Sequence, residues 1–170
     1  LPDGGGARSD PSRPTLATCM VGLVGNGAAG SKIAISLARS GVGNFLLIDD
    51  DVMLPENLVR HDLDWNAVGE HKVEGLKRRI EMIAPGAKCT VRRQQLAGQE
   101  NSGSIDGVLG LLQTCDLIID ATANPRVFNL LGSVVAAAEK PLVWLEVYGG
   151  GFGGMIARSR PGIDPPPQLA

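Results

Sequence analysis

The sequence has no long apolar run, no excess of either charge and no paired cysteines. Its apolar stretches are far shorter than the about 20 residues that a membrane-spanning helix requires. The 16 basic and 18 acidic residues are interspersed and give a net charge of −2. This balance leaves neither a basic patch for nucleic acid nor a polybasic anchor for a membrane surface. We therefore expect a protein that binds no nucleic acid and no membrane.

The cysteines stand singly in apolar segments. Cys19, Cys89 and Cys115 lack CxxC spacing, which favours small buried hydrophobic residues over metal ligands or redox pairs. This usage is typical of a reducing compartment and predicts a cytoplasmic protein. The chain begins with Leu1 and has no charged-then-apolar signal peptide. We expect it to be part of a longer protein.

The length of 170 residues is that of a single domain, which can bury about 70% of the surface of its unfolded chain. Residues 1–15 are rich in glycine, proline and serine and predict a linker. Residues 161–170 are rich in proline and predict a second linker or a truncated continuation. The folded domain is expected at residues 16–160, without internal repeats.

Short apolar runs alternate with helical patterns between these ends. The runs predict buried strands at Cys19–Val24, Phe45–Ile48, Leu117–Ile119 and Leu142–Val147, and a more polar edge strand at Cys89–Leu96. The other segments predict helices at Gly30–Ser40, Gly69–Ile83, Ile105–Gln113 and Pro125–Glu139. This alternation predicts an α/β fold, a doubly wound, mainly parallel Rossmann-like sheet with helices on both faces.

A glycine loop, Gly25-Asn-Gly27-Ala-Ala-Gly30, joins the first strand to the first long helix. Gly25 and Gly27 allow the backbone to turn tightly and to approach a phosphate, and Gly30 lets the helix pack closely. The start of this helix offers free N–H groups to an anion. Asp49 ends the second strand nineteen residues after Gly30, where a dinucleotide-binding fold has a carboxylate for ribose hydroxyls. Together these features predict a nucleotide-binding site.

The ligand of such a sheet binds outside the carboxyl ends of the strands. Four strand-exit segments are therefore expected to converge on one cleft. They are Gly25–Gly30, Asp49–Asp51, Asp120–Asn124 and Tyr148–Gly154.

A polar loop follows Asp49, and within it Asn57 and Arg60 are three residues apart. On one helical turn they would project the same way, as an amide donor and a fixed cation, which suits a triphosphate better than a nicotinamide. The alternative is a solvated loop with Arg60 in an ordinary salt bridge. Lys72 stands near the positive end of the next helix, where a cation is unfavourable unless an anion is bound. It could instead reach solvent or pair with Glu70.

The remaining polar candidates are two histidines and a strand-exit motif. His61 and His71 lack the carboxylate or cysteine spacing of a metal site and are expected to be polar surface residues. Asp120 and Asn124 follow a buried strand, where they could reach magnesium or a phosphate. Such a carboxylate could equally cap the following helix.

Taken in order, these motifs resemble the adenylating domain of ubiquitin-activating-enzyme-like proteins, the ThiF/MoeB/HesA family, over roughly Thr18 to Arg160. The motifs that carry the resemblance are the glycine loop, Ser40–Asn44, Asp49-x-Asp51, Asn57-Leu-x-Arg60, Val68-Gly69-x-x-Lys72, and Asp116–Asp120 with Thr122 and Asn124. Family members bind ATP and magnesium, are usually dimers, and adenylate the C-terminal glycine carboxylate of a small ubiquitin-like protein that ends in Gly-Gly.

The resemblance implies a role for each matching residue. The nucleotide-binding residues that it implies are Gly25, Gly27, Ala28, Gly30, Asp49, Asp51, Asn57, Arg60, Lys72 and Asn124, with Arg60 and Lys72 also catalytic. From its place at a strand exit, Asp120 is the expected magnesium ligand. Physical chemistry agrees with this scheme. A C-terminal carboxylate is already ionised near neutral pH and needs no general base, so catalysis comes from positioning and fixed cations.

The chain departs from the family pattern at three positions. Ala28 replaces a glycine and adds only a methyl group, and His61 replaces a glutamine. Ala123 stands where the family has the aspartate expected to bind magnesium. That change could slow adenylation severely, or Asp120 or Asp51 could take the metal role, or the residue could have been changed deliberately. The thioester-forming cysteine loop and the CxxC zinc motifs of some relatives do not occur in this sequence.

Two other functions remain open from the sequence. An NAD-dependent dehydrogenase domain would use the same glycine loop and Asp49. A catalytically impaired nucleotide-binding or dimerisation module would account for Ala123.

Overall fold

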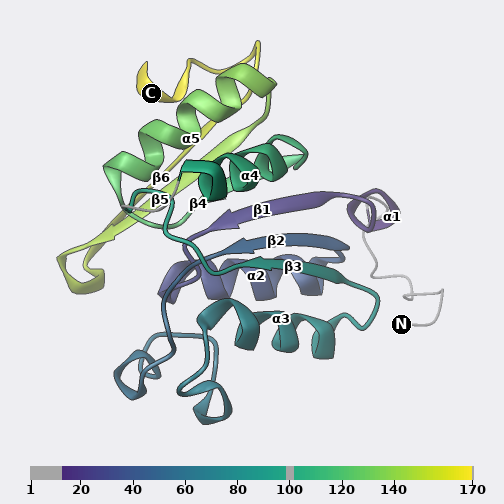
Figure 1. Cartoon of the computed structure of the whole chain (residues 1–170), viewed down its shortest axis with the longest axis vertical. Coiled ribbons are helices and arrows are strands. Elements are labelled where there is room, and N and C mark those ends of the chain that lie inside the picture. The colour runs from purple at the N-terminus through teal and green to yellow at the C-terminus, as the bar shows by residue number, and fades with distance from the viewer. Residues whose placement is uncertain (1–12, 99–101, 170) are drawn as a thin grey trace.

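A six-stranded sheet in the order β3-β2-β1-β4-β5-β6 organises the chain (Figure 1). The computed structural model describes residues 13–98 and 102–169. The strands are β1 (Met20–Val24), β2 (Asn44–Ile48), β3 (Lys88–Arg92), β4 (Leu117–Asp120), β5 (Leu142–Tyr148) and β6 (Gly153–Ser159). β1 to β5 are parallel and β6 runs antiparallel to β5. The predicted doubly wound, mainly parallel sheet is therefore confirmed.

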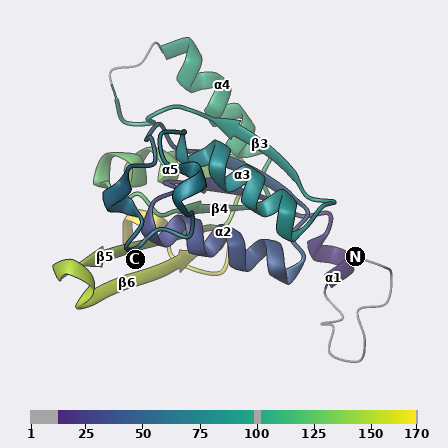
Figure 2. The same cartoon turned by 90° about the horizontal axis from the view of Figure 1, so that it is seen from below.

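Helices cover both faces of this sheet, as predicted (Figure 2). The helices are α1 (Arg13–Leu16), α2 (Ala28–Ser40), α3 (Lys72–Ile83), α4 (Ser102–Gln113) and α5 (Pro125–Ala138), with short 3-10 helices η1 (Pro55–Asn57), η2 (Trp65–Ala67), η3 (Gly149–Gly151) and η4 (Pro167–Leu169). No helix among the described residues is long and apolar enough to cross a bilayer.

Alternation along the central strands divides the core into two layers. Val21 and Leu23 of β1 pack with α2 and α3, whereas Val24 packs with α4 and α5 on the other face. Both layers need apolar residues from the same strand, which explains why the central strands are nearly uninterrupted apolar runs. β3, with its half-exposed residues, lies at the edge as predicted, but it ends at Arg92 and not at Leu96.

The antiparallel strand β6 was not predicted. Gly149, Gly150 and Gly151 all have positive φ, and this run reverses the chain into a β5–β6 hairpin. The hairpin places Tyr148–Gly154 at its tip, so these residues do not line the cleft formed by the other strand exits. The prediction that Tyr148–Gly154 would converge on that cleft is wrong.

The helix predicted from Gly69 begins three residues later, at Lys72. Gly69 has φ 90° and its N–H donates to the Met53 carbonyl, while the Lys72 N–H donates to the Asp51 carbonyl. Residues 69–72 therefore pair with the backbone after β2 before the helix starts. This pairing places Lys72 next to the carboxyl end of β2.

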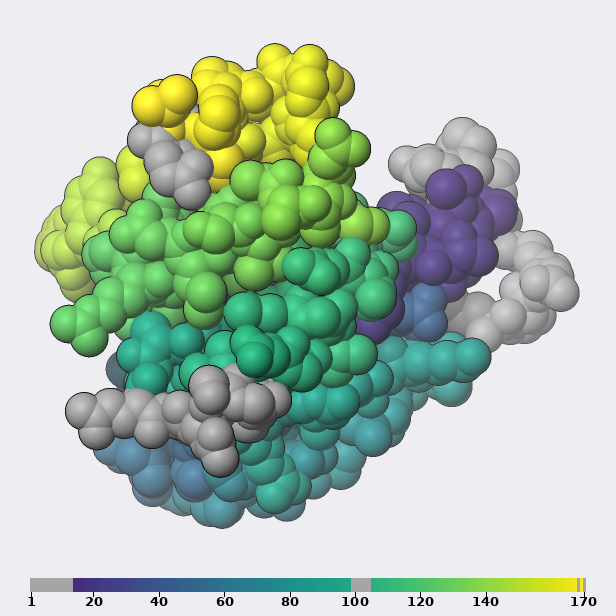
Figure 3. All heavy atoms as spheres, turned by 45° about the horizontal axis from the view of Figure 1, so that its top comes forward, coloured from purple at the N-terminus to yellow at the C-terminus, as the bar shows by residue number. Residues whose placement is uncertain are grey.

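The two predicted linkers are only partly described. Residues 1–12 lie outside the described residues, and Arg13–Leu16 form the short helix α1. At the other end of the chain, η4 packs against α5. Figure 3 shows this C-terminal segment in yellow. The domain boundaries at residues 16 and 160 stay a prediction.

Candidate functional site

A cleft of ≈ 240 Å³ lies at the carboxyl ends of β1, β2 and β4. The strand order reverses between β1 and β4, so the cleft stands at the topological switch point. Its walls combine residues from all three strand exits with the segment after β3. The lining residues that the sequence predicted for the site are Gly25, Gly27, Asp49, Asp51 and Asn124.

The three glycines of the loop have different structural roles. Gly25 has φ 82°, and a Cβ there would lie 2.9 Å from the Ala121 backbone. A Cβ on Gly30 would lie 2.0 Å from the Gly25 carbonyl oxygen, so this glycine permits α2 to pack against the loop. A Cβ on Gly27 would meet nothing within 4 Å. The backbone at Gly27 is thus open to a ligand, directly before α2 begins at Ala28.

Asp49 joins the glycine loop to the end of β2. Its Oδ2 accepts the Asn26 N–H at 2.6 Å and its Oδ1 accepts the Asp51 N–H at 2.8 Å. Burial raises the pKa of Asp49, and the two N–H bonds and Lys72 oppose that rise. Each carboxylate oxygen keeps a further lone pair for a ligand hydroxyl. The position fits the ribose-binding role that the resemblance implies.

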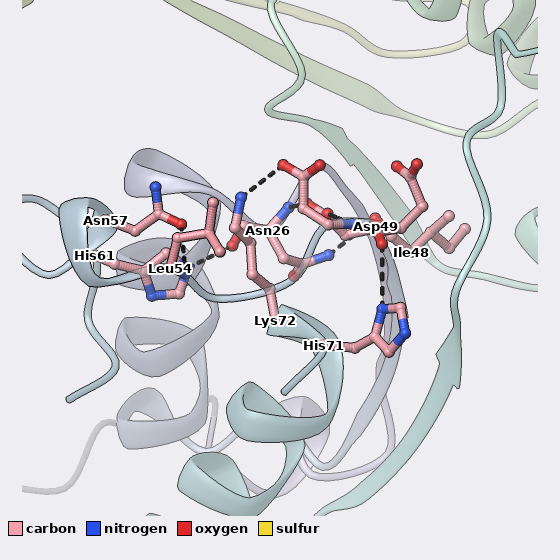
Figure 4. A network of polar contacts seen from close by, with 10 residues as sticks. Asn26, Ile48, Asp49, Leu54, Asn57, His61, His71 and Lys72 are labelled. Carbon is pink, nitrogen blue, oxygen red and sulfur yellow. Dashed lines mark hydrogen bonds and ion pairs between the residues drawn. The ribbon is translucent and has the colours of Figure 1, made fainter. Parts of the chain in front are cut away.

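Lys72 is buried, with 9% of its side chain exposed, and its Nζ lies 2.6 Å from Asp51 Oδ2 (Figure 4). Neither sequence alternative for this lysine is found, because it does not reach solvent and Glu70 pairs with Arg78. The ammonium group is instead held beside Asp51, at the edge of the cleft.

Asn57 and Arg60 lie on the turn that begins with η1, outside the cleft walls. The Arg60 N–H donates to the Asn57 carbonyl at 3.1 Å, and Asn57 Oδ1 accepts the Leu54 N–H at 3.1 Å. Lys32 of α2 donates from Nζ to the Arg60 carbonyl at 2.7 Å. The Arg60 side chain is exposed and forms no ion pair within the described part of the chain. The salt-bridge alternative is therefore not found.

His61 is buried at 8% exposure, so the prediction of a surface histidine is wrong. Its ring lies between two backbone groups, the Asn26 carbonyl and the Leu63 N–H, which a sequence pattern does not reveal. His71 is half-buried, and its Nδ1 lies 3.1 Å from the Asp50 carbonyl oxygen. No metal-type arrangement joins the two rings in the described residues.

Asp120 and Asn124 make local caps. Asp120 Oδ1 accepts the Thr122 N–H at 2.9 Å and the Thr122 hydroxyl at 2.6 Å, which closes the turn after β4. Asn124 Oδ1 accepts the Arg126 N–H at 2.9 Å and caps α5. Burial raises the pKa of Asp120, which lines a second cleft of ≈ 310 Å³ and is not part of the first cleft's wall. Asn124 lines both clefts.

Ala123 has a left-handed backbone, with φ 53°, and is exposed. Glycine, asparagine and aspartate adopt this conformation more readily than alanine. The chain therefore carries a methyl group at a position where the backbone suits an aspartate.

The sequence missed several residues that line the cleft, among them Gln94, Gln95, Leu96 and Val127. The first three follow β3, and the predicted strand had absorbed them by running to Leu96. Ending that strand at Arg92 would have placed them at a strand exit, where the cleft was expected.

Two of the three cysteines are poorly suited to act as nucleophiles. All three are free, Cys115 is buried as predicted, and Cys19 and Cys89 are half-buried. Burial raises the pKa of Cys89 to about 12 and that of Cys115 to about 11. Both thiols therefore keep their protons at neutral pH.

The fold and the cleft define a Rossmann-like α/β domain of the nucleotide-binding class. A family model described as "ThiF family" matches residues 8–163, and the chain belongs to that family. It is 36% identical to the molybdopterin-synthase adenylyltransferase of Escherichia coli over 125 residues, which are 73% of this chain and 46% of the relative. It is 35% identical over 143 residues to the uncharacterized protein y4qC of Sinorhizobium fredii, covering 81% of this chain and 24% of the relative.

Solved structures agree with this assignment at the level of the fold. The E. coli MccB structure with AMPCPP and MccA has a TM-score of 0.76 and 21% identity, and the match covers 89% of this chain and 43% of that chain. The chain spans about a quarter to a half of the length of the curated relatives it matches.

Proposed function

We propose that this domain binds ATP and adenylates the C-terminal carboxylate of a small ubiquitin-like protein that ends in Gly-Gly. The observation that carries the proposal is the buried ammonium group of Lys72, held 2.6 Å from Asp51 at the edge of a cleft that the glycine loop lines. A buried cation is costly unless it has a function or a strong partner, and Asp51 is itself 64% exposed. The membership of the chain in the ThiF family and its similarity to an adenylyltransferase support the same activity.

The size of the cleft suggests which part of ATP it would hold. Sites that enclose a whole drug-sized ligand measure about 300–1,000 Å³, and the cleft at ≈ 240 Å³ is smaller. We place the nucleoside in the cleft, with its ribose at Asp49. The phosphates would then lie over Gly27 and the start of α2, towards Lys72, Asn57 and Arg60.

The chemistry needs little from the protein beyond positioning and charge. An oxygen of the substrate carboxylate would form a bond to the α-phosphorus while the bond from that phosphorus to the β-phosphate oxygen breaks. The products are an acyl-adenylate and pyrophosphate, and no proton moves. Lys72 and Arg60 would offset the repulsion between the two anions, and the N-terminus of α2 would orient the phosphates.

Magnesium would supply further charge neutralisation on the phosphates. In such sites it is held by one or two carboxylates together with the phosphates. Asp51 lines the cleft and belongs to the acidic group Asp49, Asp50 and Asp51, whose ligand atoms lie within 4.8 Å of one another. We favour Asp51 over Asp120 for this role, because Thr122 occupies Asp120 Oδ1 and Asp120 lines the other cleft.

The proposal is tested by ATP–pyrophosphate exchange, with the intact protein, candidate ubiquitin-like proteins and magnesium. Exchange that depends on the C-terminal glycine carboxylate supports it. Tight NADH binding without ATP binding would assign the domain to the dehydrogenases instead. A homodimer in the cytoplasm belongs to the same proposal, and analytical ultracentrifugation and cell fractionation test these two points.

Arg60→Ala is expected to lower the exchange rate about tenfold. The guanidinium is exposed, and water screens an exposed charge more than it screens the buried Lys72. The stability of the folded domain should not change, because only the backbone of Arg60 forms hydrogen bonds within the described residues. Arg39→Ala is the matched control, because Arg39 is exposed at the other end of α2. Equal exchange rates for the two variants would remove Arg60 from the phosphate site.

Ala123→Asp is expected to raise magnesium-dependent exchange about tenfold, by adding a carboxylate where the family has its metal ligand. The left-handed backbone favours aspartate over alanine, so thermal melting should show no loss of stability. Alanine at this position would then be what limits the reaction. An unchanged exchange rate would mean that Asp51 suffices, and no exchange in either protein would favour a non-catalytic nucleotide-binding module.

A further inference from the structure

We propose that His61 is a positioning residue that ties the glycine loop to the segment carrying Asn57 and Arg60, so that both halves of the phosphate site keep one geometry. This inference rests on the proposed function, because ATP is the ligand whose binding it would control. The tie is the hydrogen bond between His61 Nε2 and the Asn26 carbonyl, 2.7 Å long and buried (Figure 4).

The two ring nitrogens of His61 fix its tautomer. The Leu63 N–H lies 3.1 Å from Nδ1 and can only donate, so Nδ1 must accept. Nε2 then carries the proton and donates it to the Asn26 carbonyl oxygen. Both nitrogens are satisfied only in the neutral ring, in this one tautomer.

Asn26 passes this constraint to the nucleotide cleft. It is fully buried between Gly25 and Gly27, its N–H donates to Asp49, and its Nδ2 donates to the Ile48 carbonyl at 2.9 Å. A shift of the Asn26 carbonyl would therefore move the two glycines and the Asp49 carboxylate together. His61 is bonded at the one polar backbone group of Asn26 that faces the Arg60 segment.

The neighbouring contacts hold the same segment against α2. Lys32 bonds the Arg60 carbonyl, and Ser31 Oγ accepts the Asp62 N–H at 3.2 Å. These contacts come from Ser31 and Lys32 of α2, whereas His61 reaches the glycine loop itself. Loss of the His61 bond is thus expected to loosen the loop relative to Arg60 without releasing the segment from α2.

Protonation would break the Leu63 bond that orients the ring, while Nε2 would keep its proton and its bond to Asn26. A second ring proton on Nδ1 would face the Leu63 N–H, so two donors would oppose each other. The Asn26 carbonyl and Asp62 favour the charged ring, whereas Lys72 of α3 and Lys32 of α2 disfavour it. Burial is the largest cause that lowers the pKa of His61 below its ordinary value of 6.5. The Leu63 bond is therefore intact at neutral pH and is lost in acid, and the ring is then no longer held in its place between Leu63 and Asn26.

The pH dependence of stability has a definite sign. Because the pKa is lowered on folding, the unfolded chain takes up this proton first as the pH falls. The contribution of His61 is fully present above about pH 6.5 and is lost below it. Asp49 and Asp120 have raised pKa values, and their protonation favours the folded state as the pH falls. A loss of stability in acid that disappears in a His61 variant therefore cannot come from the carboxyl groups of Asp49 and Asp120.

The test compares His61→Ala with His61→Gln in ATP binding by calorimetry, using the intact protein at pH 7.5 and pH 5.5. The amide of glutamine can both donate to Asn26 and accept from Leu63. We expect His61→Ala to weaken ATP binding about tenfold at pH 7.5, and His61→Gln to restore binding to within about threefold of wild type. Val134→Ala, at a buried core residue of α5, is a control for simple loss of stability.

The pH comparison separates positioning from packing. ATP itself titrates near pH 6.5, so the quantity compared is the ratio of wild-type to His61→Gln affinity. This ratio should fall several-fold between pH 7.5 and pH 5.5, because the protonated wild-type ring loses the Leu63 bond and its fixed position against Asn26. An unchanged ratio, or an alanine variant that binds as wild type does, would overturn the inference. A wild-type protein without ATP binding would instead refute the proposed function, and the acid stability of His61→Gln would still test the tie.

Discussion

Replacing Lys72 with methionine is expected to lower ATP–pyrophosphate exchange at least about 100-fold. Its ammonium group is the buried cation at the edge of the nucleotide cleft, and a charge shielded from water stabilises a developing anion far more than an exposed charge does. Methionine retains the apolar stem that packs at the start of α3. The loss should appear mainly in the rate of the chemical step, with a smaller change in ATP affinity.

Stability is expected to change little in Lys72→Met. The carboxylate left behind, Asp51, is 64% exposed and water can solvate it. Lys77→Met is the matched control, because Lys77 lies on the same helix with a partly exposed side chain and a long i,i+4 contact to Glu81. If Lys72→Met exchanged pyrophosphate within threefold of Lys77→Met, the phosphate-binding role of Lys72 would be refuted.

Gly30→Ala is expected to lower the free energy of unfolding by roughly 2–4 kcal/mol. The added Cβ would lie 2.0 Å from the Gly25 carbonyl oxygen, which is backbone and cannot rotate away as a side chain can. α2 and the glycine loop would have to separate, and ATP binding should fall with them. Urea denaturation monitored by circular dichroism measures this loss.

Gly110→Ala provides the control with the opposite sign. Gly110 lies within α4, is exposed, and a Cβ there would meet nothing within 4 Å. Alanine in an exposed helix interior is expected to stabilise the domain by about 0.5–1 kcal/mol. Equal effects of the two substitutions would show that the packing of α2 against Gly25 is not what Gly30 provides.

Local patterns predicted the elements of this fold well, and their ends less well. Uninterrupted apolar runs identified the buried parallel strands because a strand covered on both faces has no polar side to display. The start of α3 could not be read this way, because Gly69–Lys72 pair with the backbone after β2, far away in the sequence. β6 was missed for a related reason, since its pairing with β5 follows a reversal at three glycines with positive φ.

The candidate site divides in a similar way. Gly25, Gly27 and Asp49 were predicted from spacing and Asp51 from its place at a strand exit, and the structure brings these four residues to one cleft. His61 was predicted at the surface and is buried, because its partners are backbone groups that carry no sequence signature. The partner of Lys72 could not be predicted either. Glu70 is close to Lys72 in the sequence, but the fold pairs Lys72 with Asp51 and Glu70 with Arg78.

The sequence by itself determined the class of fold, the glycine loop and the family resemblance, because these depend on residue types at short, fixed spacings. The tertiary structure decided which polar groups meet. It buried Lys72 against Asp51 and set His61 between Asn26 and Leu63. Such pairings depend on where buried donors and acceptors find partners across the whole chain, and a buried polar group without a partner is costly enough to fix each choice.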